Sequence, residues 1–189
     1  MGSQPLLTPD TSTESGQSAV LHDRRTIRLH WVTAALVAAL WSLAQIIDDF
    51  PKGLPRVSAR STHILLGVLL AIVVVQRIRW RMQIARSLPL PGPLWLSALA
   101  KAAHRLLYIG LVAVIVLGLV NAWTRGDSLY GLVSIPKLLP GQPQLKPMVE
   151  LLHKYLANAL VIVATLHALA ALGHHFLLKD NVLRRMIGR

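Results

Sequence analysis

The stretch LLHKYLANALVIVATLHALAALGHH, Leu151–His175, decides the fold. It is an apolar run with one histidine near its start, His153, and a second, His167, fourteen positions later. Fourteen residues of α-helix rise about 21 Å and return to within about 40° of the same face. If the run crosses a bilayer whose hydrocarbon core is about 30 Å thick, both imidazoles point the same way, one near each leaflet.

The composition indicates that this run does lie in a membrane. The chain has 189 residues, of which 53% are hydrophobic and 15% charged, and its mean hydropathy is +0.51. By these values the chain is too apolar and too poor in charge for an ordinary soluble domain. Three more uncharged runs precede the last one, at Leu29–Ile47, Ser61–Gln76 and Leu106–Thr124. We therefore predict an all-α membrane protein, a bundle of four transmembrane helices at about residues 25–48, 60–82, 100–124 and 147–179.

The polar segments set the predicted domain organisation and orientation. Residues 1–23 are rich in Ser, Thr and Pro and are expected to form a disordered tail ahead of a membrane domain at 24–189. Proline-rich segments at 87–95 and 135–147 are expected to be loops. Most lysines and arginines fall on the side of the N-terminus, which predicts that both termini are cytoplasmic.

The strongly basic charge has a topological explanation. The net charge of +12 lies in short segments between the predicted spans, where orientation in the membrane and contact with anionic lipid account for it. Nucleic acid is therefore not expected as a partner, although a high isoelectric point alone can suggest it.

The residues available for chemistry inside the membrane are histidines. None of the eight acidic residues lies within the four uncharged runs, whereas a proton-coupled transporter or cation channel usually needs an intramembrane carboxylate. The chain has no cysteine, which excludes disulfides, iron–sulfur clusters, thiolate-ligated haem and covalent haem attachment through CxxCH.

Placed by depth, the histidines form two layers. His63 and His153 lie near the outer side, and His30, His104 and His167 lie near the inner side. Two imidazoles from facing helices of a bundle give a six-coordinate haem site typical of electron carriers.

We predict an outer pair of His63 with His153 and an inner pair of His30 with His167. His104 competes with His30 for the inner position, but Arg105 beside it places His104 at the headgroups. The pattern alone leaves a histidine-lined metal or proton path open as the alternative. Zinc or copper sites usually add Cys, Met, Asp or Glu ligands, and none is arranged to help.

The strings that carry these histidines resemble a known family. They are RLHWVTAALV around His30, STHILLGVLLAIVVVQRIRWR around His63, AAHRLLYIGLVAVIVLGLV around His104, and LLHKYLANALVIVATLHALAALGHHFLLKDNVLRRM around His153 and His167. In this order they resemble the bacterial di-haem cytochrome b561 family, from about Thr26 to the C-terminus.

The resemblance implies a multi-pass protein of the bacterial inner membrane with two b-type haems between its helices. The implied iron ligands are His30 and His167 for the inner haem and His63 and His153 for the outer haem. Some stand-alone members of the family are implied to be superoxide oxidases, which take an electron from superoxide at the periplasmic face and pass it to ubiquinone. Related subunits instead carry electrons between quinone and a separate redox partner protein such as a hydrogenase or a dehydrogenase. Both roles remain open at this stage.

Candidate substrate residues follow from charge and position. Superoxide is an anion, so a cationic outer surface would favour its approach; Arg125 and Lys154 are the predicted contributors. His174, about 10.5 Å beyond His167 along the helix, is expected to donate to a quinone carbonyl. Arg77 is expected to pair with a haem propionate or with the quinone headgroup. Gly67 and Gly118 are expected to let a porphyrin lie against the backbone.

Overall fold

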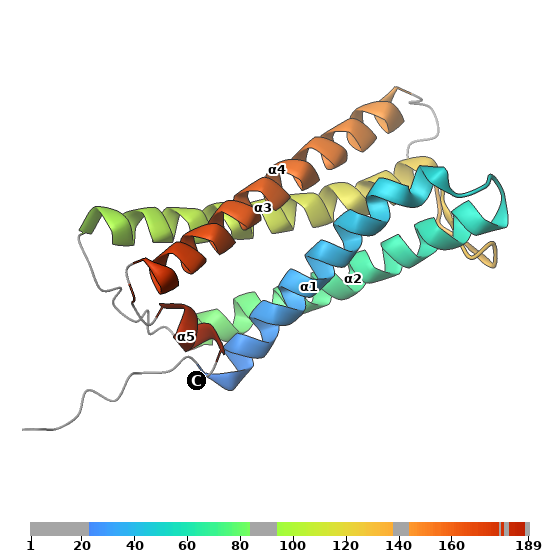
Figure 1. Cartoon of the computed structure of the whole chain (residues 1–189). Coiled ribbons are helices and arrows are strands. Elements are labelled where there is room, and N and C mark those ends of the chain that lie inside the picture. The colour runs from blue at the N-terminus through green and yellow to red at the C-terminus, as the bar shows by residue number, and fades with distance from the viewer. Residues whose placement is uncertain (1–22, 84–93, 138–143, 178, 180–181, 188–189) are drawn as a thin grey trace, which may run out of the picture.

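Four long helices, alternating in direction, make up the protein in the computed structural model (Figure 1). The structure describes residues 23–83, 94–137, 144–177, 179 and 182–187. The helices are α1 (Arg24–Ile46), α2 (Leu54–Gln83), α3 (Leu94–Arg125) and α4 (Leu145–Phe176). All four are long and apolar enough to cross a membrane, which confirms the predicted all-α transmembrane bundle.

The helix ends differ from the predicted ones where the chain leaves the apolar zone. Both α2 and α3 begin six residues earlier than hydropathy predicts. The first turn of α2 contains Pro55, which a helix tolerates there because the first backbone N–H groups have no partner within the helix. The predicted helix end at residue 179 is also displaced, since α4 stops at Phe176 and a short helix, α5 (Val182–Ile187), follows. Residues 1–22 of the predicted tail, and parts of both predicted loops, lie outside the described residues.

The two ends of the bundle carry different structures. The start of α1, the end of α4 and α5 gather at one end, which we call the inner end after the predicted orientation (Figure 1). The indole Nε1 of Trp31 in α1 donates to the carbonyl of Met186 in α5 at 2.9 Å. At the outer end lie the 3-10 helix η1 (Ile47–Asp49) and a small antiparallel hairpin of β1 (Ser128–Leu129) and β2 (Val133–Ser134).

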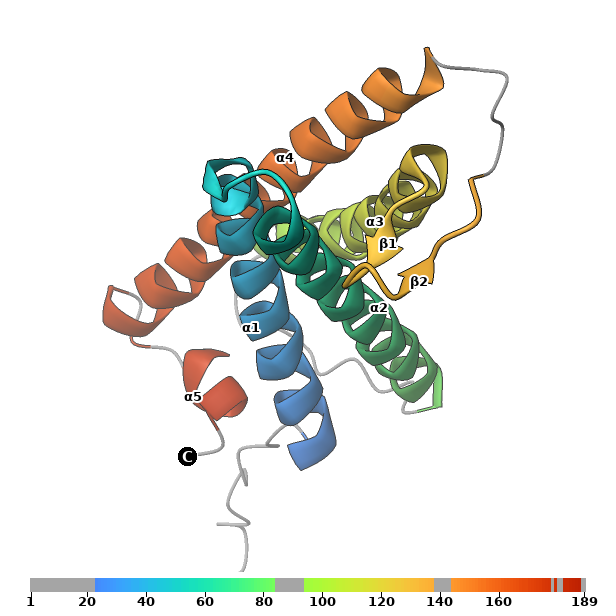
Figure 2. The same cartoon turned by 90° about the vertical axis from the view of Figure 1, so that its right-hand side faces the viewer.

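The helices pack as two pairs that meet along α2 and α3. The closest pairings are α3 with α4 and α1 with α2, whereas α1 touches α4 over a shorter length (Figure 2). Every long helix contributes to one small apolar core, made of Leu40, Leu70, Val74, Leu111 and Leu160. Most other large apolar side chains stay exposed, as expected of a surface that faces lipid.

Helix α4, which carries His153 and His167, packs closely against α3 but leaves most of its apolar residues at least partly exposed. Only 6% of its most apolar window is buried, compared with 28% for α2. The helix that sequence analysis singles out therefore leaves most of its surface to lipid or to bound groups. One polar contact ties it to α1, because Trp41 Nε1 donates to Asn158 Oδ1 at 2.9 Å. This bond satisfies an amide oxygen that would be costly to leave unpaired in an apolar setting.

Candidate functional site: two histidine clusters

The outer cluster is formed by His63 of α2 and His153 of α4. Their ring centroids lie 6.4 Å apart and their planes are nearly perpendicular. His153 Nδ1 lies 3.1 Å from the carbonyl oxygen of Val114 in α3. A carbonyl can only accept, so Nδ1 carries the proton and Nε2 keeps a lone pair. In metal-binding histidines a hydrogen bond of this kind, from one ring nitrogen to a backbone carbonyl, orients the ring and leaves the other nitrogen free for the metal.

The outer pair fits a metal held between two imidazoles. A metal–nitrogen bond of about 2 Å on each side, with about 1 Å more from each nitrogen to its ring centre, requires roughly 6 Å between centroids. The observed 6.4 Å meets this requirement. Among the described residues, His63 Nδ1 is a buried nitrogen without a hydrogen bond of good geometry, although the ring interacts with the backbone of Leu40. Buried nitrogens in this state are uncommon unless a further group completes the site.

Two glycines predicted to face a porphyrin have different surroundings. A Cβ on Gly118 would lie 3.0 Å from His153 Cε1, so α3 can approach the imidazole only because this residue has no side chain. A Cβ on Gly67 would meet no atom within 4 Å. Space for another group therefore exists one turn beyond His63 on α2.

The two predicted superoxide-approach residues differ in exposure. The Arg125 side chain is only 14% exposed and forms ion pairs with Asp127 at 3.4 Å and Glu150 at 3.3 Å. Lys154 is exposed on α4 beside His153. The charge of Arg125 is thus balanced by carboxylates that sequence analysis did not connect to it, whereas Lys154 faces outward.

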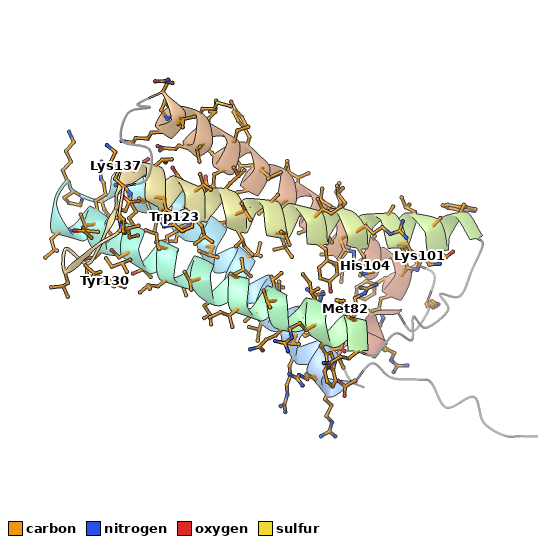
Figure 3. The ribbon with its side chains drawn as sticks, turned by 180° about the vertical axis from the view of Figure 1, so that it is seen from behind. Met82, Lys101, His104, Trp123, Tyr130 and Lys137 are labelled. Atoms are coloured by element: carbon orange, nitrogen blue, oxygen red, sulfur yellow. The ribbon has the colours of Figure 1, made fainter. Side chains whose placement is uncertain are left out.

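In the inner cluster, His167 of α4 faces His104 of α3. Their ring centroids are 5.1 Å apart. His104 Nδ1 donates to the carbonyl of Ala100 at 2.8 Å, which leaves its Nε2 as an acceptor. Figure 3 shows His104 extending from the inner half of α3. The separation is shorter than the roughly 6 Å that a metal between two imidazoles requires, so these rings touch each other directly.

His30, the predicted partner of His167, is linked to Arg77 of α2. Arg77 Nη2 lies 2.9 Å from His30 Nδ1, and a guanidinium can only donate. Arg77 also lies close enough to His104 and His167 to interact electrostatically with both. Arg77 therefore interacts with all three inner histidines, and the contact of His167 with His104 brings together the pair that the sequence left open as the alternative.

Tyr108 of α3 belongs to the inner cluster, although the sequence analysis did not single it out. The guanidinium of Arg77 lies 5.1 Å from the centre of its ring and that of Arg81 5.5 Å. Its position four residues after His104, on the same helix face, was the available signal. His174, predicted to contact quinone, is half-buried near the end of α4.

The arrangement suits a haem better than a bare metal ion. Within the described ranges, no three side chains of His, Asp or Glu gather as they would around a bound cation. A haem needs only two protein ligands, because the porphyrin supplies the other four. The outer pair of histidines matches that demand.

Comparison with known proteins gives a consistent result. Residues 21–189 match the family model described as prokaryotic cytochrome b561. The chain is 32% identical to cytochrome b561 homolog 1 of Escherichia coli K12, over 86% of this chain and 94% of that protein. It is 30% identical to the probable superoxide oxidase CybB of Yersinia pestis, over 85% and 92%. It is also 26% identical to cytochrome b562 of Cereibacter sphaeroides, over 88% and 94%.

Proposed function

The chain belongs to the prokaryotic cytochrome b561 family of transmembrane electron-transfer proteins, and from this premise we propose that it oxidises superoxide at the outer face and reduces ubiquinone. The family implies b-type haem, and the resemblance drawn from the histidine-bearing strings is confirmed. In the proposed reaction each superoxide gives up one electron and leaves as dioxygen, and ubiquinone takes up two electrons and two protons. The bound haems supply the one-electron chemistry.

The outer site is proposed to hold one haem between His63 and His153. The observation that supports this assignment is the 6.4 Å separation of the two rings. Val114 keeps His153 in the tautomer that can bind iron, and Gly118 lets α3 lie directly against that imidazole. The chain thereby provides both ligands and a packed wall on one side.

The inner site is proposed to hold a second haem between His30 and His167. Arg77 links the two histidines indirectly, since it contacts His30 Nδ1 at 2.9 Å and interacts electrostatically with His167. Within the membrane-spanning part that the structure describes, no carboxylate pairs with Arg77. A half-buried cation of this kind is costly without an anion beside it, and this cost supports the proposal that Arg77 binds a haem propionate. Release of His30 Nδ1 from Arg77 would let His30 adopt the ligand tautomer.

The sites for superoxide and quinone, at the two ends of the electron path, are proposed from charge and position. Lys154 is exposed beside His153 and is placed to attract an anion. Arg125 is proposed to add positive potential there, reduced by its two carboxylate partners. Quinone is proposed to bind near His174 at the inner end, with the chain in the bacterial inner membrane and both termini cytoplasmic.

The haem content is tested first. The purified chain should contain about two b haems, measured by a pyridine haem assay and a reduced-minus-oxidised spectrum. Absence of haem, together with spectra that do not respond to replacement of any of the four proposed ligands, would contradict the assignment.

The substrate is tested separately by stopped-flow mixing with superoxide. The haems should become reduced and should then pass electrons to added ubiquinone. A second function, an electron relay or membrane anchor for a separate redox protein, is favoured by the neutralisation of Arg125, which lowers the cationic character of the outer surface. If superoxide leaves the haems oxidised but quinol or a partner protein reduces them, the relay function is correct.

A further inference from the structure

A continuous chain of ion pairs crosses the outer end of the bundle. Asp127 of the hairpin segment contacts Arg125 at 3.4 Å and Arg60 at 4.0 Å. Arg125 continues to Glu150 at 3.3 Å, and Arg60 continues to Asp48 at 3.7 Å. We call this set, Asp48–Arg60–Asp127–Arg125–Glu150, the outer strap. It contains every ion pair found among the described residues.

The strap reaches the two helices that carry the outer histidines. Arg60 stands three residues before His63 on α2, and Glu150 stands three residues before His153 on α4. Three residues rise about 4.5 Å in an α-helix. Each arm of the strap therefore acts on the turn next to one of the two imidazoles, and Asp127 is the junction between the arms.

The junction itself is held firmly. The backbone carbonyl of Asp127 accepts from Ile135 N at 2.8 Å, which closes the hairpin segment. The hairpin is in turn fastened to α2 by Ser61, a fully buried residue whose hydroxyl accepts from Tyr130 N at 2.8 Å. The Asp127 carboxylate cannot follow its partners freely, so it defines where they lie.

The ion pairs of the outer strap differ in solvent exposure, and their expected contributions to the structure differ accordingly. The side chains of Arg125 and Asp127 are 14% and 13% exposed, whereas Asp48 is 83% exposed. Exposed ion pairs contribute little to stability because water competes for both charges. Removing one partner of a shielded pair leaves the other charge uncompensated and forces a rearrangement. A substitution at Asp127 should therefore displace both arms.

We propose that Asp127 is a positioning residue for the outer haem ligands. Through Arg60 and Arg125 it fixes the turn before His63 relative to the turn before His153, and so sets the angle and spacing of the two imidazoles. This inference rests on the proposal that these histidines hold a haem. It assigns Arg125 a part in holding the helices together, in addition to any effect on an approaching anion.

The first experiment compares haem-loaded variants D127N, D127E and D49N. Asp49 is an exposed acid at the same end of the molecule and serves as the charge-matched control. D127N should shift the electron paramagnetic resonance g values and the midpoint potential of the outer haem but not of the inner haem. D127E should restore them, and D49N should match the native protein. Unchanged outer-haem signals in D127N would overturn the proposal.

A second variant covers the case in which D127N does not fold. E150Q breaks only the half-exposed arm of the strap at Arg125. It should shift the outer-haem g values in the same direction as D127N, by a smaller amount. If E150Q folds with both haems and its outer-haem signals equal those of the native protein, Asp127 does not act through this arm and the proposal fails.

Distances between α2 and α4 provide a readout that needs no haem. The chain has no cysteine, so thiol-reactive spin labels would attach only at cysteines introduced for the purpose. L54C and L151C place them at two exposed positions. D127N should broaden the distance distribution between these labels, and D49N should not. If the native chain binds no haem but D127N broadens the distribution, the proposed function fails while the strap stands. An unchanged distribution overturns the positioning role.

Discussion

The outer and inner histidine clusters are built differently. In the outer pair His153 Nδ1 lies 3.1 Å from the Val114 carbonyl, and the two ring centroids stand 6.4 Å apart. In the inner cluster two rings touch at 5.1 Å and a third histidine is hydrogen-bonded to Arg77. The outer rings have the spacing that a shared metal requires, whereas the inner rings would have to move apart to hold one.

The two clusters also differ in the number of residues available for the proposed ligand positions. At the proposed outer site two histidines are available for two ligand positions. At the proposed inner site three histidines are available for two positions, and the hydrogen bond of Arg77 to His30 would influence which imidazole is free to bind. The inner haem should therefore be more sensitive to changes that lie outside the ligands themselves.

The largest expected effect is the loss of a whole haem. H153A should remove the outer haem and leave about one b haem per chain, because the remaining His63 cannot hold it in six-coordinate form. H63A should have the same result. H175A, which alters a histidine at the end of the same helix, should keep both haems. A pyridine haem assay measures the content, and two haems in H153A would contradict the outer assignment.

The next test separates the two candidates for the inner site. H30A should remove the inner haem, and H104A should keep it, because we propose His30 as the partner of His167. The observed contact of His104 with His167 makes the opposite result physically reasonable. Reduced-minus-oxidised spectra of the two variants decide the matter: loss of inner haem in H104A alone would transfer the ligand role to His104.

A smaller effect is expected from the arginine. R77M should lower the midpoint potential of the inner haem, since a nearby positive charge favours the reduced, less positive iron. A one-electron couple shifts by about 59 mV for a tenfold change in its equilibrium constant, and we expect a fall of that order by redox titration. R81M, which removes the neighbouring cation over Tyr108, should change the potential less. An equal shift in both variants would argue against a specific role for Arg77.

The smallest effect is expected at the outer surface. K154Q should slow reduction by superoxide modestly, and the difference from the native protein should shrink as ionic strength rises, because salt screens exposed charges over about 10 Å at 0.1 M. K146Q, an exposed lysine earlier on α4, should have less effect. The rates come from stopped-flow mixing at several salt concentrations, and a salt-independent loss in K154Q would indicate a structural cause.

Much of the fold could be predicted because the membrane imposes simple rules. A span must be apolar and helical over about 20 residues, so all four helices were visible as uncharged runs. The early starts of α2 and α3 were not, because those turns lie outside the apolar zone. The hairpin was also missed, since each of its strands has only two residues.

The membrane depths of the site histidines could be predicted, but the contacts of their side chains could not. Helical rise places His63 level with His153 and groups the other three histidines. Which rings touch depends on side-chain rotamers and on Arg77, which a spacing rule does not contain. The pairing of Arg125 with Glu150 was likewise hidden, because it joins the end of α3 to α4 across a loop.

The placement of both His153 and His167 on α4 has a consequence for biosynthesis. A membrane chain is made from its N-terminus, so the last of the four long helices enters the bilayer after the others. Neither proposed centre has both ligands until α4 is in place, and an unfinished chain would retain neither haem. Because few residues of α4 are fully buried despite its contact with α3, the haems would cover further surface of this helix, and cofactor loading would be the final step of folding.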